Sequence, residues 1–62
     1  MTDEQRLFET AVRDAVVVLT LMRKDVFAGP EFVTADESTD KAKAAGWTFH
    51  EIEDEARKRA SQ

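Results

Sequence analysis

The sequence predicts an all-α fold: a single domain over residues 1–62, with a long N-terminal helix and two short helices folded back along it. A repeated helix-start pattern and a helical spacing of apolar residues both predict this class. Thr2, Thr34 and Thr48 are each followed three residues later by Gln or Glu. In such a capping box the Thr hydroxyl accepts a hydrogen bond from the third amide of the helix, and the Gln or Glu side chain reaches back to the Thr amide. Three helix starts are therefore expected.

The first helix is expected over about 3–27. Its apolar residues recur four and three positions apart, as in a coiled-coil heptad: Phe8, Val12, Ala15, Leu19, Met22 and Val26. Gly29 and Pro30 follow, and they are typical of a helix end, because Gly adopts a left-handed backbone and Pro cannot continue the helix. A buried strand over 16–21 is the alternative, since valine and threonine favour β structure. The helical spacing on both sides of this segment favours the helix.

The second helix is expected over about 35–45, closed by Gly46, and the third over about 49–60. The inward positions of the second helix are all small, which allows close packing on the first: Ala35, Ser38, Ala42 and Ala45. Those of the third are Phe49, Ile52 and Ala56, with Trp47 packing on Ile52 as a hydrophobic staple. Placed end to end, the short helices match the length of the first and cover one of its faces but not two.

Large apolar residues are unevenly distributed along the chain. Eleven lie between Leu7 and Phe27, but only five follow Gly29. A chain of this size buries only ~60% of its unfolded surface, and with no cysteine it can form neither a disulfide nor a thiolate zinc site. We therefore expect another protein chain to complete the fold.

A small non-catalytic protein–protein interaction module is the function that this excess predicts. It would form a homodimer or bind a different protein through the first helix. The predicted interface residues are Leu7, Phe8, Val12, Val17, Val18, Leu21, Met22 and Phe27. No catalytic, cofactor-binding or metal-binding site is predicted.

A small DNA-binding regulator is the alternative. The spacing Ala42…Gly46…Ile52 resembles that of a helix-turn-helix, although the pattern is generic. Such a protein would dimerise through the first helix, and its candidate nucleic-acid contacts are Thr48, His50, Arg57, Lys58 and Arg59. The net charge of −4 disfavours this function, because phosphate contacts supply most non-specific affinity for nucleic acid. Acid-to-base pairs four residues apart explain the basic cluster more simply, as a solvent-exposed helix face.

Other chemistry has weaker support. The stretch from His50 to Asp54 looks like a zinc metalloprotease helix in which aspartate replaces the second histidine, and the chain holds no further histidine. The acidic residues fit an ordinary solubilising surface better than an imitation of DNA. The N-terminal residues are acidic, unlike a signal peptide, and the longest apolar run is too short to span a membrane. We expect a cytoplasmic protein.

Overall fold

Three helices and no strand make up residues 2–61, which are the residues that the computed structural model describes. They are α1 (Asp3–Arg23), α2 (Pro30–Ala44) and α3 (Phe49–Ala60). The predicted all-α class is confirmed, and the alternative strand over 16–21 is wrong because that segment continues α1.

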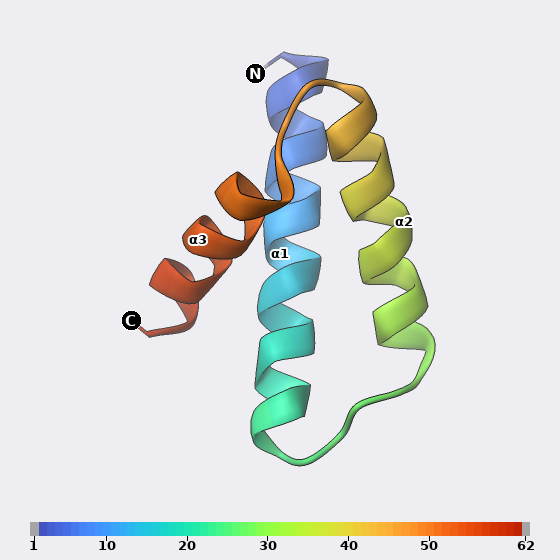
Figure 1. The fold of residues 1–62 in the computed structure, drawn as a ribbon, viewed down its shortest axis with the longest axis vertical. Helices are drawn as coiled ribbons and strands as arrows, with labels where there is room; N and C mark the ends of the chain where they lie inside the picture. The colour runs from blue at the N-terminus through green and yellow to red at the C-terminus, as the bar shows by residue number, and fades with distance from the viewer. Residues whose placement is uncertain (1, 62) are drawn as a thin grey trace.

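The helices are arranged around α1, which lies between the other two (Figure 1). α2 runs antiparallel beside α1, and the chain then crosses the N-terminal half of α1 to reach α3, which diverges from α1 toward its own C-terminus. Both short helices pack extensively on α1 but hardly touch each other. They therefore lie on two sides of α1, whereas the sequence predicted that they would cover one face end to end.

The core is small and is built mostly from alanine. Its fully buried members come from all three helices: Ala11, Val12, Ala42, Ile52 and Ala56. Small side chains let helix axes approach closely, and the predicted inward positions of the second helix are confirmed in Ala35, Ser38 and Ala42. Phe49 is a correction, since it is 53% exposed at the start of α3.

α1 ends four residues earlier than predicted, at Arg23. Asp25 adopts a left-handed backbone with φ 62°, and its amide donates to the carbonyl of Met22. The amide of Val26 donates to the carbonyl of Leu21 at 3.0 Å, which completes a Schellman motif. Asp25 is therefore the left-handed residue that ends the helix, a position that the sequence assigned to Gly29.

α2 begins five residues earlier than predicted. Gly29 is its N-cap and Pro30 occupies its first turn, where a missing N–H costs nothing. The hydroxyl of Thr34 donates to the carbonyl of Pro30 at 3.0 Å, so Thr34 lies inside the helix and the capping box predicted there is wrong. At the other two predicted sites a threonine does cap the helix. The hydroxyl of Thr2 accepts a hydrogen bond from the amide of Gln5, and Thr48 forms the full reciprocal capping box with Glu51.

Replacement of Asp25 by glycine is expected to stabilise the protein by about 0.5–1 kcal/mol. A left-handed conformation costs an L-residue roughly 1–2 kcal/mol, and glycine avoids this cost while adding some entropy to the unfolded chain. Gly46→Ala is the matched control, because Gly46 has φ 108° with open space around it, so added strain alone should destabilise that variant. Urea unfolding measures both, and a destabilised Asp25→Gly would contradict the expectation.

Candidate interaction groove

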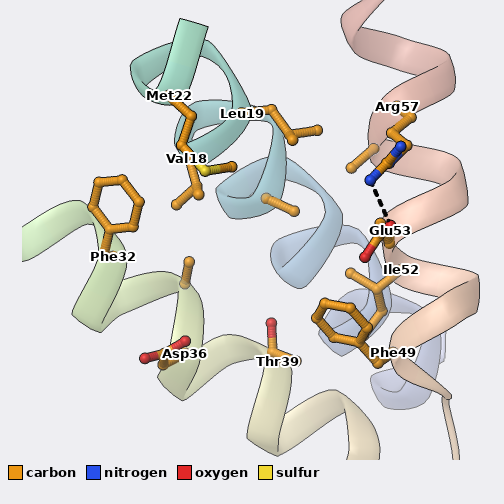
Figure 2. A pocket seen from close by; sticks show the side chains of 13 residues that line it. Val18, Leu19, Met22, Phe32, Asp36, Thr39, Phe49, Ile52, Glu53 and Arg57 are labelled. Carbon is orange, nitrogen blue, oxygen red and sulfur yellow. Dashed lines mark ion pairs between the residues drawn. The ribbon is translucent and has the colours of Figure 1, made fainter. Parts of the chain in front are cut away.

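An open groove of about 270 Å³ lies between the three helices. It is hereafter the apolar groove. α1 contributes Ala15, Val18, Leu19 and Met22; α2 contributes Phe32, Ala35, Asp36 and Thr39; α3 contributes Phe49, Ile52, Glu53, Ala56 and Arg57. Figure 2 shows Phe32 and Phe49 on opposite sides of the groove, with the side chains of Val18, Leu19 and Met22 along α1.

The groove exists because small side chains face large ones. Between the large side chains of Phe32 and Phe49, α2 and α3 bring Ala35, Thr39 and Ala56, which are too short to fill the space as α3 diverges from α1. Val18 and Met22 consequently stay half-buried. Part of the apolar surface predicted for the first helix therefore lies in this concave site, in Val18, Leu19 and Met22.

Charged side chains line part of the groove. On α3, the guanidinium of Arg57 pairs with the carboxylate of Glu53 at 2.8 Å, as Figure 2 shows. On α2, Asp36 is exposed and forms no ion pair within residues 2–61. The α2 side of the groove therefore carries an uncompensated negative charge.

The structure divides the predicted interface among several places. Val18 and Met22 lie in the apolar groove. Val12 is fully buried in the core, so in this fold it cannot contact a partner. Phe8 packs against Trp47, with ring centroids 4.3 Å apart.

The other predicted interface residues lie outside the groove. Leu7 and Val17 line two separate hollows beside α2. Leu21 is half-buried on α1. Phe27, which was expected in the first helix, lies in the loop after α1 and is 66% exposed.

Sequence reasoning missed Phe32, which lies between the first two helices as they were predicted. The signal for it was present: Pro30 is typical of a first helical turn, and from there Phe32, Ala35, Asp36 and Thr39 fall on one helical face. Phe49 was predicted to face inward, and instead it borders the groove with about half of its surface exposed.

The candidate nucleic-acid contacts are partly engaged within the chain. Arg57 pairs with Glu53, and Arg59 contacts both Glu9 and Glu55. Lys58, Thr48 and His50 are exposed. Ala42 and Ile52, which define the helix-turn-helix spacing, are both buried in the core. DNA binding stays a prediction, which a gel-shift assay at low salt tests.

Arg59 links the C-terminal part of α3 to α1. Its guanidinium donates to both carboxylate oxygens of Glu9 at 2.9 Å and to Glu55 at 3.0 Å. The hydrogen bonds from Arg59 hold the pKa of Glu9 below its ordinary value. In return, the hydrogen bonds to Glu9 and Glu55 raise the pKa of Arg59.

Glu9→Gln is expected to lower the melting temperature at neutral pH by a small amount, because the pair is exposed to solvent. The folded pKa of Glu9 is depressed, so its contribution to stability is present above the unfolded pKa and is lost as pH falls through the folded pKa. The melting temperatures of the two proteins should therefore converge in acid. If the difference in melting temperature between the wild type and Glu9→Gln stayed constant down to the lowest pH at which the protein folds, the charge of Glu9 would not be the source of its contribution to stability.

Metal-ligand clusters and membrane-spanning helices are both absent from residues 2–61. No three His, Asp or Glu side chains gather there as metal ligands would, and none of the three helices is long and apolar enough to cross a membrane. Comparison with known proteins gives no matching family, no significantly similar curated protein and no significantly similar solved structure.

Proposed function

We propose that this chain is a small, non-catalytic protein–protein interaction module whose binding surface is the apolar groove. The observation that carries the proposal is the half-buried state of Val18, Leu19 and Met22, between α2 and α3. Removing such apolar surface from water stabilises a complex by roughly 25 cal/mol per Å² before the costs of association.

The size and lining of the groove favour a protein side chain as the ligand. At about 270 Å³ the groove is smaller than the ~300–1,000 Å³ cavities that enclose drug-sized ligands, and it is open on one side. Its lining within the described residues contains no histidine and no serine, and two of its three charged groups, Glu53 and Arg57, neutralise each other. These features suit a partner that inserts one or two apolar side chains.

Binding of a hydrophobic dye to the dilute protein tests this function. The wild type should increase the dye fluorescence, and Val18→Asp should reduce the increase by placing a charge inside the groove. Val33→Asp is the matched control, because Val33 is 58% exposed on α2 outside the groove. A dilute wild-type protein that binds no dye, or a signal that Val18→Asp leaves unchanged, would contradict the proposal.

A further inference from the structure

We infer that the occupant of the apolar groove is Phe27 of a second copy of this chain, in a closed two-fold dimer. The inference rests on the proposed function and names the partner for the same groove. It starts from an exposed aromatic side chain and an unfilled apolar site at the same end of one molecule.

Phe27 is the most exposed large apolar side chain in the part of the chain that the structure describes, at 66%. It lies outside the helices, next to Val26, which is also exposed. An aromatic ring buries up to 150–250 Å² and dominates the energetics of many interfaces. Since most of its surface faces solvent, Phe27 does not fill the groove of its own chain.

The groove and Phe27 lie near each other because one loop connects two of the groove helices. Met22 in the last turn of α1 and Phe32 in the first turn of α2 both line the groove. Phe27 is in the loop between them, five residues from each. This loop joins the ends of α1 and α2 on the side away from the N-terminus (Figure 1).

This proximity favours a closed dimer. In a two-fold pair the same surface patch contacts itself, so Phe27 of each copy can enter the groove of the other at once. If the aromatic ring and the groove were on distant surfaces, the same contact would produce open-ended chains of molecules.

Arg23 and Lys24 near Phe27 are opposite in charge to Asp36 in the groove, and Asp25 and Glu31 also flank Phe27. Arg23 and Lys24 precede the loop, both exposed and neither ion-paired within residues 2–61; Arg23 donates only to the carbonyl of Ala60 at 3.4 Å. Asp36 in the groove also has no ion pair. We expect insertion of Phe27 to bring Arg23 and Lys24 of one copy toward Asp36 of the other, which would offset part of the repulsion between two chains of net charge −4.

The chain exposes somewhat more surface than an average monomer of its mass. The chain exposes 4420 Å², against about 4,000 Å² for an average compact monomer of its mass. The excess is roughly half of the ~800 Å² that each partner buries in a standard interface. We expect the monomer to stay folded when the dimer dissociates on dilution, because the three helices of one chain complete the core by themselves.

Sedimentation equilibrium over a concentration series tests the inference on four proteins: the wild type, Phe27→Asp, Val18→Asp and Val33→Asp. The wild type and Val33→Asp should form dimers as concentration rises. Phe27→Asp and Val18→Asp should dimerise at least about tenfold more weakly, because each removes an interface anchor. Far-UV circular dichroism verifies that each variant is folded. If Val18→Asp is unfolded, the Phe27→Asp result decides the test, because Phe27 lies outside the helices and the core.

Two results would overturn the inference. A wild type that stays monomeric throughout would exclude the second copy, and dye binding by that monomer would leave the proposed function intact. A dimer as stable in Phe27→Asp as in the wild type would show that the copies associate through another surface. A monomer that also binds no dye would overturn both proposals.

Discussion

Ile52→Ala is expected to unfold a large fraction of the protein. Ile52 is 1% exposed and is one of the two largest fully buried side chains, in contact with a core otherwise made of Ala11, Val12, Ala42 and Ala56. Truncation of a buried isoleucine costs about 2–5 kcal/mol, since the lost contacts leave a cavity. A domain of 62 residues has a free energy of unfolding of roughly 3–9 kcal/mol.

Urea unfolding followed by far-UV circular dichroism measures this effect. The matched control is Ile52→Val, which removes one methylene and should cost about 0.5–1.5 kcal/mol. An Ile52→Ala variant with the wild-type midpoint would mean that the three helices are held together by contacts other than this core.

Trp47→Ala is expected to have the next largest effect. Trp47 follows α2 and stacks on Phe8 of α1, with ring centroids 4.3 Å apart and planes tilted by 33°. Its indole Nε1 donates to the carbonyl of Glu4 at 2.9 Å. The ring therefore fixes the segment between α2 and α3 to the first turns of α1. Because Trp47 is half-buried, the loss should fall near the lower end of the ~3–5 kcal/mol range for such truncations.

Trp47→Phe separates the two contributions of this side chain. It keeps an aromatic ring beside Phe8 but removes the hydrogen bond to Glu4, which is worth about 0.5–1.5 kcal/mol. Differential scanning calorimetry should rank the wild type above Trp47→Phe, and Trp47→Phe above Trp47→Ala. Equal stability of the two variants would show that stacking on Phe8 contributes nothing.

The sequence was most informative where local hydrogen bonds decide the structure. α3 begins where predicted because Thr48 and Glu51 satisfy each other's backbone amides, and both partners lie within four residues. It was least informative where two local signals competed. Pro30 and Thr34 can each start a helix, and the earlier one does. The end of α1 was missed because aspartate seldom adopts the left-handed conformation that Asp25 has.

The groove could be predicted in part. The excess of large apolar residues before residue 28 is consistent with the half-buried state of Val18, Leu19 and Met22 on α1. Which residues share a face depends on the direction of α3, and that direction depends on long-range contacts, above all the packing of Ile52 and Ala56 against Ala11 and Val12. No spacing within a single helix reports such contacts. Val12 was therefore assigned to the interface although it is in the core.

The methyl resonance of Met22, followed by nuclear magnetic resonance on dilution, tests most directly whether a second copy fills the groove. Met22 lines the groove. The indole N–H of Trp47 donates a hydrogen bond to the carbonyl of Glu4 outside the groove, so its resonance is an internal control. The Met22 resonance should shift with concentration, because the ring of the second copy's Phe27 approaches it, and this shift should disappear in Phe27→Asp. A Met22 resonance that does not move at concentrations where the wild type is dimeric would contradict docking of Phe27 in the groove.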